Sequence, residues 1–158
     1  MTDATSLNLR KSLGKFATGV TVVTCRSGDG RSCGITANSF SSVSLDPPLI
    51  LWNIAKTCNS LDAYLEAEHY AIHVLTNDQV HLASHFAQTD HKSYERIEHS
   101  ISDNGVPILP DVLARFDCRT YQIYDAGDHH IIVGEILHHE NHAGSPLLYY
   151  SGNYASLD

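Results

Sequence analysis

The pattern of apolar and polar positions changes its period along the chain, and each change marks a predicted element. Residues 7–17 place apolar side chains at helical spacing with basic residues between them, which predicts an amphipathic helix that ends by Gly19. Later segments either alternate or form short β-branched runs, which is typical of strands. The predicted strands cover residues 21–25, 32–37, 49–54, 70–75, 115–124 and 129–139.

Turn-forming residues separate the predicted strands. Ser27-Gly28-Asp29-Gly30 predicts a hairpin turn rather than a phosphate loop, because no helix-forming pattern follows it. Asp125-Ala126-Gly127-Asp128 predicts a second hairpin turn, between the two longest strands. Strand 49–54 is apolar almost throughout, so we expect it to be buried on both faces.

Two short helices are expected among the strands. One follows residues 56–60, where Thr57, Asn59 or Ser60 would be the N-cap. The other carries an apolar face over residues 80–86 and would be capped by Asp78. Two further segments are predicted to be irregular: residues 88–104, a polar surface loop or short helix, and residues 151–158, a short tail.

These elements predict a mainly β fold with flanking helices, a closed antiparallel barrel in one domain spanning residues 1–158. No apolar run approaches the roughly 18 residues of a membrane span, and residues 1–6 lack the basic and apolar regions of a signal peptide. The four cysteines form no C-x-x-C pair, which favours reduced, structural thiols. We therefore expect a cytoplasmic protein without a membrane partner.

The formal net charge is −8, and it is unevenly distributed along the chain. Residues 1–61 carry six Lys and Arg against three Asp and Glu, whereas residues 62–158 carry four against fifteen. Such an acidic chain is a poor partner for nucleic acid, because phosphate-backbone binding depends on basic clusters. The first 61 residues offer the more favourable surroundings for a phosphorylated ligand.

One stretch, residues 34–48, combines features of a strand and of a loop, and we call it the lip. It begins with alternating Ile35-Thr36-Ala37-Asn38, continues as a run of hydroxyl side chains and stops at Pro47-Pro48, which are expected to hold the chain extended. Composition alone favours a serine-rich loop. The alternative is a binding lip, whose short donors and acceptors and backbone near Gly34 recognise the edge of a planar heterocycle.

Other chemistry has little support in the sequence. No G-x-G-x-x-G follows a strand, so a Rossmann nicotinamide site is not predicted. No G-x-S-x-G or Ser/His/Asp order stands out that would indicate a serine nucleophile. His81 and His85 stand four apart on a predicted helix, but a third ligand at fixed spacing is missing, so no metal is expected. The remaining histidines near the end of the chain are interpreted as strand-face and turn residues: His130, His138, His139 and His142.

Four ordered segments resemble the flavin reductase-like family, the small NAD(P)H:flavin oxidoreductase components of two-component flavin monooxygenases. The lip, G-I-T-A-N-S-F-S-S-V-S-L-D-P-P, resembles the family's signature loop. Residues 13–24 resemble its opening F-A-T-G-V-T-V-V-T, and residues 146–150 its closing P-L-L-Y. Gly127-Asp128-His129, followed by the strand at 133–136, resembles its G-D-H motif. The resemblance implies an FMN-binding split barrel, a Greek-key β-barrel that forms homodimers.

The resemblance also implies where a flavin would bind. Its isoalloxazine would lie on the lip, and its phosphate beside the turn at 56–60, where Cys58 and Asn59 replace serines of the family. His85 stands where the family has an arginine. The residues implied to bind the flavin or the nicotinamide cofactor are Thr36, Ala37, Asn38, Ser39, Ser44, Trp52, Asn53, Lys56, Thr57, Cys58, Asn59, Ser60, His85, Phe86, Asp128 and His129.

The implied activity is reduction of FMN or FAD by NADH or NADPH, after which the reduced flavin leaves for a partner monooxygenase. His129 would place the nicotinamide, with Asp128 fixing its tautomer. From the residues alone, a structural histidine bonded to a backbone carbonyl is the other interpretation. Two alternative functions stay open: a flavoprotein that keeps its flavin and reduces another acceptor, such as a corrinoid or metal complex, and a non-catalytic flavin-binding or storage protein.

Overall fold

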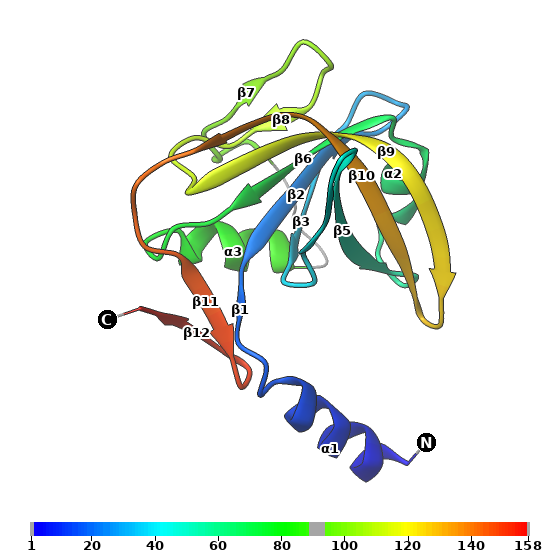
Figure 1. Cartoon of the computed structure of the whole chain (residues 1–158), viewed down its shortest axis with the longest axis vertical. Helices are drawn as coiled ribbons and strands as arrows, with labels where there is room; N and C mark the ends of the chain where they lie inside the picture. Colours follow the sequence, from blue (N-terminus) through cyan, green and yellow to red (C-terminus); the bar gives the residue numbers. More distant parts are fainter. Residues whose placement is uncertain (1, 89–93, 158) are drawn as a thin grey trace.

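The structure is a computed structural model that describes residues 2–88 and 94–157. Figure 1 shows a strongly curled β-sheet with helices against it and, below it, a projecting part that we call the arm, formed by the first helix and the last two strands. The helices are α1 (Asp3–Leu13), α2 (Leu61–Glu66) and α3 (Val80–Ala87). The strands are β1 (Thr18–Gly19), β2 (Thr21–Arg26), β3 (Ser32–Ala37), β4 (Ser41–Leu45), β5 (Pro48–Ala55), β6 (His69–Val74), β7 (Ser100–Ile101), β8 (Pro107–Ile108), β9 (Ala114–Ala126), β10 (His129–Asn141), β11 (Leu147–Tyr150) and β12 (Asn153–Ser156).

The main sheet has the strand order β3-β2-β6-β9-β10-β5-β4, and its neighbouring strands pair antiparallel. A second sheet, β1-β11-β12, belongs largely to the arm. The mainly β, antiparallel prediction is confirmed. The barrel differs from the expected closed form, since among the described strands the hydrogen-bonded order ends at β3 and β4. These two edge strands are consecutive in the chain, and β3 curls back to contact β5.

Strand β5 shows why the core and the site lie on opposite faces of one element. Ile50, Trp52 and Ile54 are buried in the core, whereas Asn53 and Ala55, which alternate with them along the strand, are only half-buried. The expectation of burial on both faces was therefore wrong. An antiparallel strand gives one face to the core, and in β5 the other face borders a cleft.

The core is formed by aromatic and aliphatic side chains inside the curled sheet. The Trp52 ring lies 5.4 Å from that of Tyr64 and 6.1 Å from that of Tyr70, both edge-on. A second cluster, centred on Phe86, joins α3 to β2 and β11. This packing holds β3 against α3, beside the candidate site.

Several predicted boundaries are corrected by the structure. Helix α1 begins after Thr2, whose hydroxyl accepts a hydrogen bond from the Thr5 amide at 3.3 Å, and it ends at Gly14 rather than near residue 17. Gln79, not Asp78, occupies the N-cap of α3, because the Asp78 carboxylate accepts a hydrogen bond from Thr76. No residue of α1 is buried.

Two segments expected to be irregular contain strands. The predicted tail forms β12, which pairs with β11 because Gly152, at φ 81°, allows a tight turn between them. Within 88–104 the structure places β7, while residues 89–93 of that predicted loop lie outside the described residues.

The second half of the lip also differs from a loop. Residues 41–45 form β4, which pairs with β5. Pro47 follows a cis peptide bond, and residues 46–47 turn the chain instead of holding it extended. Across the described helices, none is long and apolar enough to cross a membrane.

Candidate functional site

Two adjoining cavities lie where β3 and β5 end, and together we call them the cleft. The first has a volume of about 370 Å³ and the second about 470 Å³. They share the walls Ile35, Thr36, Asn38 and Ala55. Each volume is in the range that holds a drug-sized ligand, which is typical of small-molecule sites.

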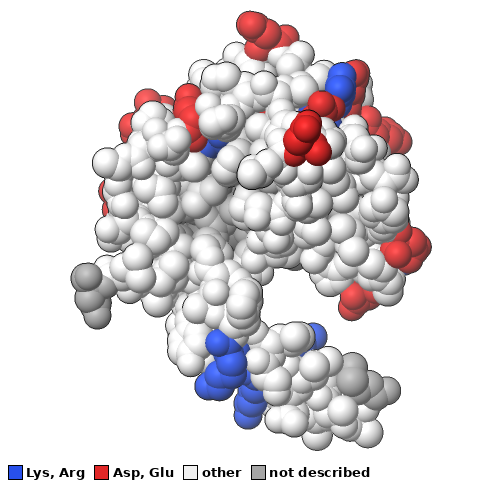
Figure 2. Space-filling model, in the orientation of Figure 1, with Lys and Arg blue, Asp and Glu red and all other residues white. Residues whose placement is uncertain are grey.

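The cleft is walled by uncharged side chains. Within the described residues, neither cavity is lined by Lys, Arg, Asp or Glu. Figure 2 shows the molecule hollowed between the arm and the barrel, with acidic side chains over the barrel and basic ones on the arm. The cleft therefore suits a largely apolar, planar ligand, and any phosphate within it would meet neutral donors.

The first half of the lip is fixed by its own hydroxyl groups. Thr36 Oγ1 donates a hydrogen bond of 2.7 Å to the Ala83 carbonyl on α3. Ser39 Oγ accepts one of 2.9 Å from the Asn53 amide on β5. These side chains tie the lip to its neighbours, whereas Asn38 is exposed and lines both cavities. The sequence analysis assigned Thr36, Asn38 and Ser39 to the site. In the structure, the hydroxyl groups of Thr36 and Ser39 form hydrogen bonds within the fold.

Asn53 lines the second cavity and carries an unsatisfied acceptor. Its Oδ1 is buried and has no hydrogen-bond partner among the described residues. Leaving a buried acceptor unpaired costs about 1–3 kcal/mol, so a ligand N–H that reached it would gain that amount. Trp52, the neighbouring residue expected close to the flavin, is instead fully buried in the core and lines neither cavity.

The first cavity runs from the turn after β5 to the arm. Thr57, Cys58 and Asn59 line it on one side, as the sequence suggested. Tyr149 and Tyr154, from β11 and β12, line it on the other, with ring centroids 5.6 Å apart. The sequence analysis gave neither tyrosine a role. Tyr149 lies in the segment P-L-L-Y-Y, which resembles the closing motif of the family. That resemblance is the one signal in the sequence that could have assigned Tyr149 to the site.

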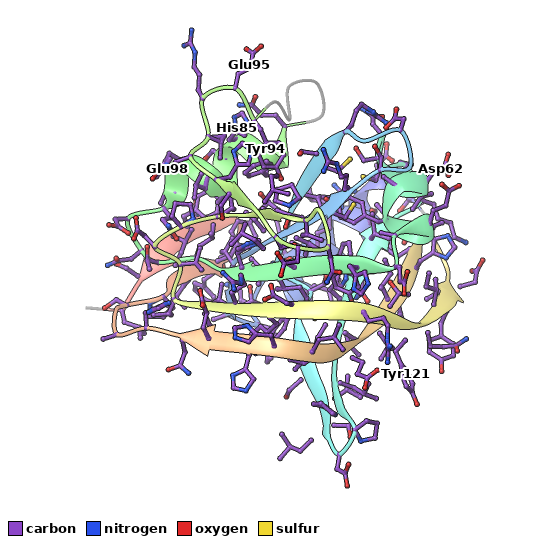
Figure 3. All side chains as sticks on the ribbon, turned by 90° about the horizontal axis from the view of Figure 1, so that it is seen from above. Asp62, His85, Tyr94, Glu95, Glu98 and Tyr121 are labelled. Carbon is purple, nitrogen blue, oxygen red and sulfur yellow. The ribbon has the colours of Figure 1, made fainter. Side chains whose placement is uncertain are left out.

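Not every implied residue lies in the cleft. Phe86 lines the first cavity, but His85 beside it does not, and Ser44 and Ser60 also lie outside both linings. In Figure 3, His85 and Tyr94 lie at the α3 end of the molecule, and Asp62 lies apart from them on α2. The α2 turn has only six residues, with no side-chain cap from Ser60.

His129 opens β10 and lines the second cavity with Ala37 and Ser39. Its Nδ1 lies 2.7 Å from Asp128 Oδ1, and the hydrogen bond with His129 lowers the pKa of that carboxyl. The imidazole is therefore held by a carboxylate and not by the backbone carbonyl of the structural interpretation. Its ring, with a side chain 45% exposed, is accessible to a ligand.

Metal binding has no support in the residues that the structure describes. In residues 2–88 and 94–157, no three or more His, Cys, Asp or Glu side chains are grouped so that they could hold an ion. His81 and His85 therefore remain a pair on α3. The four cysteines are free thiols.

The curled antiparallel barrel and its uncharged cleft define a protein that binds a small planar molecule. Comparison with known proteins gives the family: the chain belongs to the flavin reductase-like family, whose domain, described as "Flavin reductase like domain", matches residues 13–158.

Among its relatives, the chain is 47% identical to the FMN reductase (NADH) SmoA of Agrobacterium fabrum, over 94% of this chain and 84% of that protein. It is 42% identical to the reductase component of the flavin-dependent trigonelline monooxygenase of Acinetobacter baylyi, over 92% of this chain but 47% of that protein. The solved NADH:FAD oxidoreductase SgcE6 of Streptomyces globisporus C-1027, in complex with NAD and FAD fragments, superposes with a TM-score of 0.93. That match is 30% identical and covers 100% of this chain and 96% of the other. The split-barrel prediction is thereby confirmed.

Proposed function

We propose that this protein is an NADH-dependent flavin reductase that reduces FMN or FAD and releases the reduced flavin to a separate monooxygenase. The observation that carries the proposal is that Asn53, whose buried Oδ1 has no hydrogen-bond partner among the described residues, lines the same cavity as His129. An acceptor buried beside an accessible imidazole fits a heterocycle with an N–H edge on one side and a second ring on the other. The relatives named above are reductases of this kind.

The protein's contribution is to hold two rings together. When both are bound, a hydride passes from C4 of the nicotinamide to N5 of the flavin, so the cofactors carry the chemistry. Asn53 and Asn38 would hold the polar edge of the isoalloxazine against the lip. Thr57, Asn59 and the pair of tyrosines would enclose the rest of the flavin in the first cavity.

The uncharged first cavity supports exchange of the flavin in each turnover. Among the described residues that line it, the first cavity offers a phosphate hydrogen bonds from Thr57 and Asn59 but no bidentate Arg or Lys partner, so a phosphate there is held less tightly than in a cationic site. A reductase that supplies another enzyme needs such release. This feature favours a diffusing flavin substrate over the alternative with a retained flavin.

Steady-state oxidation of NADH or NADPH, measured with added FMN or FAD in the four pairings, tests the proposal. Turnover that rises with free flavin and saturates is the expected result, with NADH preferred. Turnover that needs no added flavin would instead support a flavoprotein with a retained flavin and another acceptor. No turnover in the presence of bound flavin would support a binding or storage protein.

The substitution His129→Ala is expected to raise the KM for NADH about tenfold while leaving the flavin Kd within about twofold. The reason is position: His129 borders the second cavity from β10, across from the lip. Flavin titration by fluorescence and stopped-flow reduction measure the two effects separately. Weaker flavin binding with an unchanged reduction rate at saturating NADH would place His129 in the flavin site instead.

We also propose a cytoplasmic homodimer, and the arm supports the dimer. Helix α1 makes no buried contact, and its Leu7 and Leu13 are 55% and 65% exposed. Phe16, just beyond it, is 80% exposed. An isolated helix of this length is marginal in water, because most helical stability in proteins comes from packing an apolar face. A second copy would cover that face, and the basic arm complements the acidic barrel (Figure 2).

Sedimentation equilibrium at micromolar concentration is expected to give twice the mass of one chain. Substituting Phe16→Glu should shift the species toward the monomer, because a charge at the covered face is costly. The matched surface change Asn104→Glu, at an exposed position in the turn between β7 and β8, should leave the mass unchanged. A fully active species of one-chain mass for the parent would rule out the functional dimer. The free thiols fit a reducing cytoplasm, where NADH is available.

A further inference from the structure

The ion pair between Lys56 and Asp125 joins two elements that flank the cleft. Lys56 directly follows Ala55, the last residue of β5 and a shared wall of both cavities. Its ammonium group lies 2.9 and 3.0 Å from the two carboxylate oxygens of Asp125 on β9. Lys56 lines neither cavity, so its implied role as a flavin contact has no support in this arrangement.

The pair reaches across an intervening strand. In the sheet, β10 lies between β5 and β9, and His130 of β10 is opposite both Ile54 and Asp125. Neighbouring strands are about 4.8 Å apart, so a side chain on β5 that reaches β9 must be long. Lysine meets that requirement. The start of β10, with His129, is therefore bracketed by a bond between its two neighbours.

A backbone bond reinforces the same connection. The Lys56 backbone amide donates a hydrogen bond of 2.9 Å to the Asp128 carbonyl. This bond lies one residue beyond the last paired position of the two strands, where His129 is opposite Ala55. Asp128 in turn accepts from the His129 imidazole at 2.7 Å. Lys56 thus contacts the end of the β9–β10 hairpin, residues 125–130, through its backbone and its side chain.

The charges at this hairpin end are arranged around Lys56. The Lys56 charge acts on two carboxylates, Asp125 and Asp128. Each carboxylate also has a neighbouring imidazole, His130 for Asp125 and His129 for Asp128. The hydrogen bond from Lys56, more than its charge alone, lowers the pKa of Asp125. The pair is exposed, with side chains 36% and 72% accessible, and such pairs contribute little to global stability. Its effect must therefore be local, on the position of the hairpin end.

We propose that Lys56 and Asp125 form a latch that holds the end of the β9–β10 hairpin against β5 and so sets the position of His129 over the cleft. Lys56 and Asp125 are positioning residues, because they act through His129. The proposal rests on the proposed function for the role of His129 toward the nicotinamide. Figure 1 shows the end of the β9–β10 hairpin projecting at the lower edge of the sheet, where β10 pairs with β5.

A double-mutant cycle tests the latch. Lys56→Met, Asp125→Asn and the double variant are each expected to raise the KM for NADH about fivefold, all to the same value, since each breaks the same bond. The flavin Kd should stay within about twofold, and Lys56→Arg should restore the parent KM. The control is Glu135→Gln, which breaks the pair with Arg119 within the β9–β10 hairpin, away from its end.

Hydrogen exchange supplies a readout that does not depend on activity. The amide of Lys56, bonded to the Asp128 carbonyl, should exchange about tenfold faster in Lys56→Met and Asp125→Asn than in the parent or in Glu135→Gln.

The outcomes separate the latch from the function on which it rests. Additive effects of the two single changes, or weakened flavin binding with an unchanged KM for NADH, would overturn the latch and give Lys56 a direct ligand contact. So would unchanged exchange at the hairpin end. If His129→Ala leaves the KM for NADH unaltered while the exchange result holds, the role of His129 fails and the latch remains as a structural feature.

Discussion

Substituting Gly34→Ala is expected to lower the free energy of unfolding by about 1–3 kcal/mol and to weaken flavin binding severalfold. A β-carbon at this position would lie 2.5 Å from two ring carbons of Phe86 and 2.9 Å from the Tyr94 hydroxyl. Phe86 is fully buried and also lines the first cavity. An added methyl group must therefore displace a core ring that is part of the site.

The control for this change is Gly28→Ala in the β2–β3 turn, where an added β-carbon meets nothing within 4 Å. That variant should unfold within about 0.5 kcal/mol of the parent. Combining Gly34→Ala with Phe86→Leu should recover part of the flavin affinity, because the smaller side chain makes room. Chemical denaturation and flavin titration give both quantities. If Gly34→Ala behaves like Gly28→Ala, β3 does not need the glycine for its contact with α3.

The strands of this fold were predictable because alternation is a local property of the sequence. The β9–β10 hairpin is the clearest case: alternating side chains and a Gly127 that adopts φ 67° specify two strands and a tight turn. The predicted strands, 115–124 and 129–139, are shorter than β9 and β10 in the structure, because antiparallel pairing continues as long as a partner strand is present. The same reason explains β12, a strand only because β11 lies beside it.

The site was predictable where one segment carries it and less so where distant segments meet. Asn38 and His129 come from motifs, and the structure brings both to the second cavity. Tyr154 reaches the first cavity only because the arm folds back, which no local pattern reveals. An apolar run such as residues 49–54 also does not tell which face of a strand meets the core, and the structure places Trp52 on the core face of β5.

Acid is expected to destabilise the fold through His73, the buried histidine of β6. Its Nδ1 lies 3.0 Å from the Val22 carbonyl, and its Nε2 accepts a hydrogen bond of 3.1 Å from the Leu109 amide. Both ring nitrogens are thus used by the neutral form. If Nε2 were protonated, it could no longer accept the hydrogen bond from Leu109, and two N–H groups would face each other. Burial, and to a smaller extent nearby Arg115, lowers the pKa of His73 to about 4.

The sign of the effect follows from the two pKa values. An unfolded histidine titrates near 6.5, so below that pH the unfolded chain binds a proton that the folded chain does not. The stability due to neutral His73 is complete above about pH 6.5 and is lost as the pH falls toward 4. The loss accumulates to about 3 kcal/mol over that interval, at about 1.4 kcal/mol per pH unit.

The measurement is the free energy of unfolding at several pH values between 7 and 4 for the parent and for His73→Gln. The glutamine variant will be less stable at pH 7, because it cannot reproduce both ring contacts, but it has no proton to gain at this position. The difference in unfolding free energy between the two proteins should therefore narrow as the pH falls. Taking this difference cancels the contribution of Asp117 and of the other carboxylates that both proteins share. A constant gap from pH 7 to 4 would mean that His73 accepts a proton in the folded state as readily as in the unfolded chain.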